Sequence, residues 1–402
     1  MHQEQFHTAV PARRQYGLDL VRAAAIVSVM AYHANNMLVQ TGPSLLSFGW
    51  MGVDLFFVLS GFLIGGQLLK PYSVGSRPSF GRFFARRAFR TIPAFAFVAM
   101  LYFAFPRLRE TPDIQPLWQF VTFTENLLFQ PTGPKAFDQV WSLCVEEQFY
   151  LFFPLILMAM ERAPSTRKTA TILIAILLGG MLVRSFLWLA FVANKPFDLR
   201  SETDWHAYVT LIYYPTWSRL DGLLAGVALA ALKTFRGSWW RRLVARPNLL
   251  LAAGLFGIGA SITLFGGPVL PILGVAIGFP LLSVSVASIV AAASTGRGMI
   301  CKSHVPGVRA LATGAYSLYL THKIAFHAVQ AVIAPALGAT RGYALLAAGM
   351  VAALLIGTAI YWTVERPFLI LRDRWDGKSR TSLDRHFVGS PEFGAELAVE
   401  QA

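Results

Sequence analysis

The stretch that decides the fold is "LDLVRAAAIVSVMAYHANNML", residues 18 to 38, an apolar run that carries Arg22 near its start and His33 near its end. A helix of this length is about 30 Å long, which matches the hydrocarbon core of a bilayer. Of the 402 residues in the chain, 55% are hydrophobic and only 14% are charged, and the mean hydropathy is +0.52. These values lie outside the range of soluble domains, so the sequence predicts an integral membrane protein.

Apolar runs of similar length recur from end to end, separated by short polar loops. We count about ten of them, at 18–38, 49–69, 91–106, 142–160, 169–193, 212–232, 248–266, 269–293, 310–336 and 342–364. The first run exceeds the roughly 7 to 15 apolar residues of a secretory signal, and no cleavage site is evident. We therefore expect an uncleaved first span and an all-α bundle of about ten transmembrane helices.

The formal net charge of +14 is distributed loop by loop. The loops after the second and sixth runs contain basic residues and no acid: Lys70, Arg77, Arg82, Arg86, Arg87 and Arg90, and then Lys233, Arg236, Arg241, Arg242 and Arg246. The positive-inside rule makes these loops cytoplasmic, and no nucleic-acid partner is expected. With ten spans both termini are cytoplasmic. We expect a tail at 1–15, a membrane domain at 16–371 and a short disordered tail at 372–402.

Ionisable groups at membrane depth are costly, so each is a candidate functional residue. Arg22 and His33 are about 16 Å apart along the first helix, with Arg22 near the inner mouth and His33 beyond the midplane on the outward side. For His33, helix packing and catalysis are equally open. The neighbouring Asn35 and Asn36 are candidates for lining an entrance.

Further charged residues in the runs predict a supporting polar network. Its members are Asp54, Trp141, Arg219, Asp221, His322 and Glu365. Asp54 needs a partner, and we favour a structural role for it over a catalytic one. Arg219 and Asp221 are expected to neutralise one another or Asp54, and Glu365 is expected at the inner surface, where Pro367 ends the helix and an arginine is within reach.

The arginine-rich stretch "FGRFFARRAFRTIPAF" places Arg82, Arg86 and Arg90 four residues apart, so they form one stripe on a helix together with Arg87. Like charges at this spacing repel, and a polyphosphate ligand explains them better than their own stability does. Contact with anionic lipid is the alternative explanation.

The stretch "VWSLCVEEQFYLFFPLIL" places Glu146 and Glu147 at the outer end of the fourth run, on the same side as His33. Adjacent residues project about 100° apart on a helix, so we expect only one of them to face an interior site. The two cysteines, Cys144 and Cys301, are predicted at opposite ends of the bundle, which excludes a disulfide between them. No metal-ligand spacing is present, and no metal is expected.

These groups suit one chemistry. A cytoplasmic donor that carries phosphates docks on the arginines and extends its reactive end towards His33, which acts as general base for an acceptor hydroxyl. A proton-coupled transporter of a small anion or glycolipid also uses intramembrane charges. We find no convincing internal repeat of the kind that many transporters show.

The motifs that carry a resemblance follow one another along residues 16 to 368: "YGLDLVRAAAIVSVMAYH", "GVDLFFVLSGFLI", "FFARRAFRTIP", "VWSLCVEEQFYLFFP", "RLDGLLAGVALA", "YSLYLTH" and "VERPF". In these motifs the chain resembles the membrane-bound acyltransferase-3 family, which includes bacterial O-acetyltransferases of surface polysaccharides. The resemblance implies transfer of an acyl group, most often acetyl, from cytoplasmic acyl-CoA to a carbohydrate or glycolipid acceptor. It implies acyl-CoA as co-substrate, no permanently bound cofactor, and a location in the bacterial inner membrane.

The resemblance assigns the catalytic role to His33, with Glu146 or Glu147 as the acid of the fourth-run motif. It assigns Arg87 and Arg90 to donor binding, and we add the adjacent Arg86 and the inner Arg22. Cys144 stands where the family often has a serine, but a buried cysteine is more often inert than covalently catalytic. Some relatives carry a further soluble domain, whereas this chain is expected to act on its acceptor directly or through a separate protein.

Overall fold

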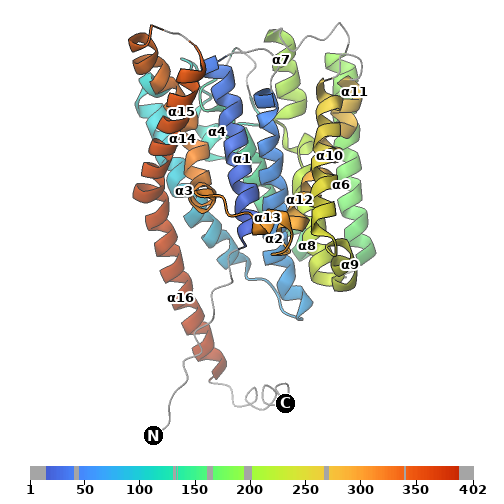
Figure 1. Cartoon of the computed structure of the whole chain (residues 1–402). Helices are drawn as coiled ribbons and strands as arrows, with labels where there is room; N and C mark the ends of the chain where they lie inside the picture. Colours follow the sequence, from blue (N-terminus) through green and yellow to red (C-terminus); the bar gives the residue numbers. More distant parts are fainter. Residues whose placement is uncertain are drawn as a thin grey trace.

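The computed structural model of the chain describes residues 15–39, 45–129, 133, 135–160, 166–193, 202–266, 271–338 and 341–388. The described residues form helices and no strand, apart from one isolated bridge between Ile114 and Ala136. The predicted tail at 1–15 falls almost wholly outside these residues, as does 389–402. Figure 1 shows the long helices running side by side in a single bundle.

Each of the ten predicted runs corresponds to a helix. The helices are α1 (Tyr16–Ala34), α2 (Gly52–Ser73), α3 (Phe80–Ala104), α5 (Trp141–Met160), α6 (Thr166–Leu187), α8 (Asp221–Phe235), α10 (Pro247–Gly266), α12 (Phe279–Ala293), α14 (Val308–Ala336) and α15 (Tyr343–Ile360). Shorter helices connect them: α4 (Leu117–Val121), α7 (Glu202–Tyr208), α9 (Gly237–Leu243), α11 (Pro271–Leu273) and α13 (Met299–Lys302). The all-α membrane fold is therefore confirmed.

Eight helical segments of the described chain are long and apolar enough to cross a membrane. The eight do not include α8, which has only 15 residues, or α14, whose hydropathy is lowered by polar residues such as His322, Lys323 and His327. Both of these helices nevertheless pack against the long helices in the bundle. The number of spans and the cytoplasmic position of both termini stay predictions. The inner end of the bundle is defined as the end where α1 begins, at the bottom of Figure 1.

Helices α2 and α8 approach one another at backbone distance. A Cβ atom added at Gly61 would lie 2.1 Å from the carbonyl oxygen of Leu223, and one added at Gly226 would lie 2.2 Å from that of Val58. Only glycine fits at these two positions. The small residues of this part of α2 therefore let the two helices pack closely.

Two predicted helix boundaries are wrong. Helix α3 begins at Phe80 rather than near residue 91, so the arginine stripe lies inside the helix and not in a loop before it. Helix α8 begins at Asp221 rather than near residue 212, because the chain breaks into a short 3-10 turn after Pro215, and Arg219 lies in that connection. Hydropathy alone does not locate such breaks.

The tail expected to be disordered from residue 372 is helical as far as Val388. Helix α16 (Arg366–Val388) follows α15 through a π-helical turn, Tyr361–Glu365, so Pro367 lies in the first turn of a helix and does not end the helical path. The π-helical turn interrupts the regular backbone pairing just before the proline, and such turns accommodate a residue that cannot donate a backbone hydrogen bond. In Figure 1, α16 extends beyond the inner end of the bundle.

Candidate active site

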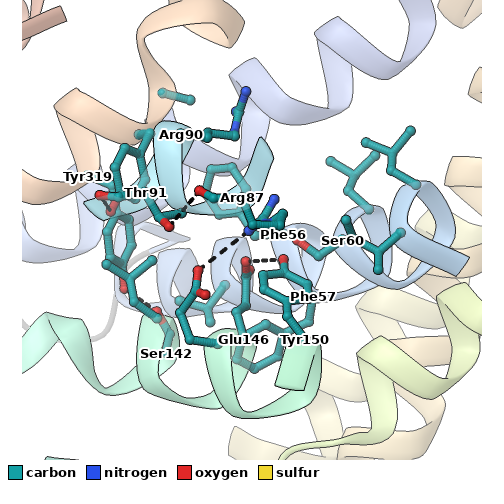
Figure 2. Close-up of a pocket in the computed structure, with 18 of the residues that line it drawn as sticks. Phe56, Phe57, Ser60, Arg87, Arg90, Thr91, Ser142, Glu146, Tyr150 and Tyr319 are labelled. Carbon is teal, nitrogen blue, oxygen red and sulfur yellow. Dashed lines mark hydrogen bonds and ion pairs between the residues drawn. The ribbon is translucent and has the colours of Figure 1, made fainter. Parts of the chain in front are cut away.

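A pocket of about 240 Å³ lies between α1, α2, α3, α5 and α14. Its polar lining residues are Arg22, Ser60, Arg87, Arg90, Thr91, Ser142, Glu146, Glu147, Tyr150, Tyr316 and Tyr319. Apolar side chains of α2, including Phe56 and Phe57, form one wall (Figure 2). The pocket therefore combines three arginines with two carboxyl groups inside the bundle.

Arg87 is at the centre of the contacts in this pocket. Its Nη2 atom lies 3.6 Å from Oε1 of Glu147, and its guanidinium carbon lies 3.9 Å from the centre of the Tyr150 ring. The Tyr150 hydroxyl donates a hydrogen bond of 2.5 Å to Glu146 (Figure 2). The side chain of Arg87 is thus held by a carboxylate and an aromatic face, while its Nε atom has no hydrogen-bond partner in the described part of the chain.

The prediction that Glu146 and Glu147 lie on the outward side with His33, at the far end from the arginines, is wrong, because both line the pocket that holds the arginines. The prediction that only one of them faces an interior site fails for the same reason. The start of helix α5 is buried in the bundle: Gln139, Val140 and Trp141 are at most 5% exposed. The segment before α5 folds into the bundle, and its depth cannot be read from hydropathy.

The predicted donor-binding arginines divide into two groups. Arg22, Arg87 and Arg90 line the pocket, whereas Arg86 donates a hydrogen bond to Asp376 of α16 and is not among the lining residues. Arg82 also lies 3.6 Å from Asp376. Helix α16, which the polar composition of this segment does not predict, thus provides an acid for one side of the stripe.

Glu365 does not form the expected ion pair with the stripe. It accepts a hydrogen bond of 2.6 Å from the hydroxyl of Ser317. Arg90 is close enough to interact with its charge, but no ion pair between them is formed within 4 Å. The carboxyl group therefore lies beside the pocket rather than in it.

His33 lies outside the lining of the pocket, and its ring centre is 5.0 Å from that of His322 on α14. Nδ1 of His322 is 3.2 Å from the carbonyl oxygen of Leu318, and its buried Nε2 has no hydrogen-bond partner among the described residues. Tyr319 joins the two places, since it lines the pocket while its ring centre lies 5.9 Å from that of His322. Ser142 and the carbonyl oxygen of Gln139 hold the Tyr319 hydroxyl at 2.6 and 2.7 Å.

A second charged group adjoins the histidine pair. Nζ of Lys323 lies 2.8 Å from Glu110 and 2.5 Å from Asp138. Burial raises the pKa of Glu110, but the ammonium of Lys323 more than offsets it, so this pKa lies below its ordinary value. Sequence reasoning missed the pairing. The available signal was that Lys323 lies in the middle of the apolar run 310–336 and therefore needs an acid, and the loop before α5 has several.

The remaining charged residues form two separate ion pairs. Nη2 of Arg219 is 3.1 Å from both carboxylate oxygens of Asp54, whereas Asp221 is 2.5 Å from Arg184 of α6. Trp141 stacks on Tyr214 and lies 5.5 Å from the guanidinium of Arg219. The sequence did not indicate Arg184 as the partner of Asp221, because a single arginine in an apolar run resembles a residue at the end of a span.

No group of three or more His, Cys, Asp or Glu side chains in the described residues could hold a metal ion. Cys144 and Cys301 are both free, and Cys144 is buried. Asn35 is buried and Asn36 is exposed at the outer end of α1, where the helix changes to π geometry. None of these residues lines the pocket.

Comparison with known proteins finds one family whose model matches most of the chain. A family model described as an acyltransferase domain, Acyl_transf_3, matches residues 15–362. The chain is 30% identical over 233 residues to the peptidoglycan O-acetyltransferase of Listeria monocytogenes, and 32% identical over 244 residues to a Bacillus subtilis protein provisionally named a peptidoglycan O-acetyltransferase. It is 31% identical over 228 residues to a Staphylococcus aureus protein provisionally named an O-acetyltransferase.

These matches cover 54%, 57% and 54% of this chain for the Listeria, Bacillus and Staphylococcus proteins, and 34% of each relative. The matched part is thus about a third of the length of each of these relatives. No solved structure matches the chain significantly.

Proposed function

This chain belongs to the acyltransferase-3 family, and we propose that it transfers an acetyl group from cytoplasmic acyl-CoA to a hydroxyl group of a carbohydrate on the outer side of a bacterial inner membrane. The observation that carries the proposal is the pocket with Arg22, Arg87 and Arg90, whose wall residue Tyr319 lies beside His322, which in turn lies beside His33. A cationic pocket and a candidate base are thus neighbours inside one bundle.

The arginines suit the donor. The phosphate groups of an acyl-CoA are anionic, and a guanidinium binds phosphate oxygens through paired hydrogen bonds. Arg87 is positioned by Tyr150 and Glu147, and Arg90 lies one helical turn further along α3. The pocket is smaller than a whole coenzyme, so in this proposal it holds the acyl end of the donor and the nearest phosphate contacts, while the nucleotide end stays towards the inner side.

Base catalysis is the role proposed for His33. An imidazole nitrogen of His33 takes the proton of the acceptor hydroxyl as the hydroxyl oxygen attacks the thioester carbonyl carbon. The carbon to sulfur bond then breaks, and the thiol leaves with a proton returned from His33. His322 positions His33: if Nδ1–H of His322 donates to the Leu318 carbonyl, its Nε2 is an acceptor on the buried side.

The geometry imposes one condition on this route. His33 does not line the pocket, so the acyl group must pass the ring of Tyr319 to come within reach of it. Tyr319 is held by Ser142 and by the Gln139 carbonyl, and Phe56 packs against its ring with the ring centres 6.3 Å apart. In this proposal the passage between the two parts of the site is at Tyr319.

The acceptor is proposed from the relatives. Two of them are named for peptidoglycan, which is a glycan built on the outer side of the membrane, and we propose a cell-surface glycan or its lipid-linked precursor for this chain. Glu146 and Glu147 serve in this proposal as anchors of Arg87 and Tyr150 rather than as partners of His33, because both lie at the arginine pocket.

The test uses purified protein in nanodiscs with acetyl-CoA labelled in the acetyl group and a glycan acceptor. His33→Ala is expected to abolish transfer while acetyl-CoA still binds, because the arginine pocket is intact. His327→Ala is the matched control, since this residue is a histidine of α14 that belongs to neither site and should leave transfer unchanged. Transfer by His33→Ala at the wild-type rate would remove His33 as the base.

A further inference from the structure

Five basic side chains gather at the inner end of α2, α8, α9 and α10, away from the arginine pocket. They are Lys70, Lys233, Arg241, Arg242 and Arg246, and we call them the basic surface. All five are exposed. None of them forms an ion pair or lines the pocket in the described part of the chain.

The packing of the helices brings these charges together. Helices α2 and α8 run in contact through Gly61 and Gly226, so their ends lie at the same depth, and the charge of Lys70 acts on Lys233. Helix α9 then packs against the end of α8 (Figure 1). Trp240 of α9 lies parallel to Phe62 of α2, with ring centres 6.3 Å apart and an angle of 19°.

Lys233 lies over this aromatic pair. Its Nζ atom is 5.3 Å from the ring centre of Phe62 and 5.6 Å from that of Trp240. Cation–π contacts of this kind fix the position of the ammonium group but leave its charge in place. The ammonium group of Lys233 is therefore held in one position without its charge being neutralised.

The sequence around the basic surface contains no acid that could neutralise it. No Asp or Glu occurs from residue 55 to 109 or from residue 222 to 364, and these two segments contain all five basic residues. Repulsion among uncompensated like charges destabilises the folded chain at low ionic strength. An anion bound at the basic surface would relieve this repulsion.

The surroundings of the basic surface indicate which anion this is. Trp239 is 66% exposed and stands next to Trp240, and Leu243, at 37% exposed, ends the same short helix. Tryptophan and leucine beside arginines are typical of a helix that lies in the interface of a bilayer, where the rings sit at headgroup level. A soluble phosphate compound would leave these apolar side chains in water.

We propose that the basic surface binds the phosphate headgroups of anionic phospholipids, with Trp239 inserted among the lipids and the five cations around the headgroup. The proposal does not rest on acyl transfer, because no residue of the basic surface belongs to the pocket. It concerns the leaflet on the inner side of the bundle.

The full chain is placed in nanodiscs of phosphatidylcholine that contain a limited amount of phosphatidylglycerol. Native mass spectrometry of the protein released from the nanodiscs then measures which lipids stay bound. The wild type should retain phosphatidylglycerol selectively. Arg241→Gln with Arg242→Gln should weaken this binding about 30-fold, since each surface cation contributes about fivefold. Trp239→Ala should weaken the retention of both lipids.

The control is Arg309→Gln with Arg374→Gln, which removes the same charge near the inner end, at the start of α14 and in α16. If this control loses phosphatidylglycerol as strongly, net charge and not the basic surface attracts the lipid, and the proposal fails. The melting temperature of each variant, measured in phosphatidylcholine alone, shows whether the variant is folded. Lys233→Gln is used in place of any variant that does not fold. If inorganic phosphate stabilises the protein as much as phosphatidylglycerol does, the ligand is a soluble phosphate and the lipid assignment is wrong.

Discussion

Arg87 and Glu147 face one another across the pocket, with Nη2 of the arginine 3.6 Å from Oε1 of the glutamate. Helix α3 provides the arginine and α5 the glutamate, so the contact joins two helices at the depth where Tyr150 also packs on the guanidinium. A carboxylate this close would oppose a bound phosphate by repulsion, but it also holds the guanidinium in one place before the ligand arrives. Pre-positioning of this kind lowers the cost of binding.

Arg87→Ala should therefore weaken the binding of acetyl-CoA. A hydrogen bond to a charged group contributes about 1.5 to 3 kcal/mol, which corresponds to a loss of roughly 10-fold to 150-fold in affinity. Isothermal titration calorimetry with the protein in detergent measures the dissociation constant of acetyl-CoA. Arg87→Lys should recover only part of the loss, because an ammonium group lacks the planar fork of the guanidinium. An unchanged dissociation constant for Arg87→Ala would exclude this residue from the donor site.

Arg86→Ala should leave the affinity for acetyl-CoA within about twofold of the wild type, although Arg86 is adjacent to Arg87 in the sequence. Its side chain donates to Asp376 of α16 and does not line the pocket. Asp376→Asn should behave in the same way in the calorimetric titration. If Arg86→Ala weakened the binding of acetyl-CoA as much as Arg87→Ala does, the whole arginine stripe would bind the donor. Helix α16 would then have to move away from Arg86 to let the donor reach it.

The difference between these two arginines shows what the sequence could predict. Periodicity and charge were sufficient for the ten long apolar helices and for the spacing of the arginine stripe, because those properties are local, whereas the start of α3 and the helix α16 were not predicted. The partner of Arg86 lies 290 residues away in a segment whose polar composition favoured disorder. No local pattern indicates that contact.

The depth of Glu146 and Glu147 was unpredictable for a related reason. Both residues lie on α5, as predicted. The segment before α5 folds into the bundle, however, so the start of this helix is buried inside the protein. The pairing of Asp54 with Arg219 was one of the two alternatives that the sequence left open, because a charge at membrane depth requires a partner, whereas the choice of Arg184 for Asp221 depended on helix packing.

Breaking the pair of Asp54 and Arg219 should destabilise the protein strongly. Both side chains are at most 3% exposed, and loss of one partner from a buried pair typically costs about 3 to 5 kcal/mol. Arg219→Met should lower the melting temperature more than the double variant Arg219→Met with Asp54→Leu, which leaves no unpaired charge. Thermal unfolding in detergent compares them. A double variant less stable than the single one would mean that the pair stabilises the fold beyond mutual neutralisation.

Gly226→Ala should destabilise the contact between α2 and α8 by about 1 to 3 kcal/mol, because the new Cβ would lie 2.2 Å from the carbonyl oxygen of Val58. Gly66→Ala is the matched control. A Cβ at Gly66 meets no atom within 4 Å, and alanine is favoured over glycine in a helix interior by about 1 kcal/mol. The control should therefore be neutral or slightly stabilising in the same unfolding assay. Equal melting temperatures for the two variants would contradict the close approach.

Glu125 and Glu110 should respond to pH with opposite sign. Glu125 is 0% exposed, and neither of its carboxyl oxygens has a hydrogen-bond partner in the described part of the chain. Burial, followed by the nearby charge of Asp138, raises its pKa well above the ordinary value. Above about pH 4.3 the unfolded chain releases the Glu125 proton, whereas the folded chain keeps it. Glu125 therefore lowers the free energy of unfolding progressively as the pH rises from about 4.3 towards the pKa of Glu125 in the folded chain. Glu125→Gln should raise the melting temperature at pH 7, with the gain disappearing near pH 4.

Glu110 has a pKa below its ordinary value because Lys323 holds the carboxylate, against the effect of burial. Its contribution is present in full above about pH 4.3 and is lost as the pH falls through the lower folded pKa. Glu110→Gln should therefore lower the melting temperature at pH 7, where Lys323 loses one of its two carboxylate partners. The two variants make the same substitution in the same loop, so a shift of the melting temperature in the same direction for both at pH 7 would contradict the opposite directions of the two pKa shifts.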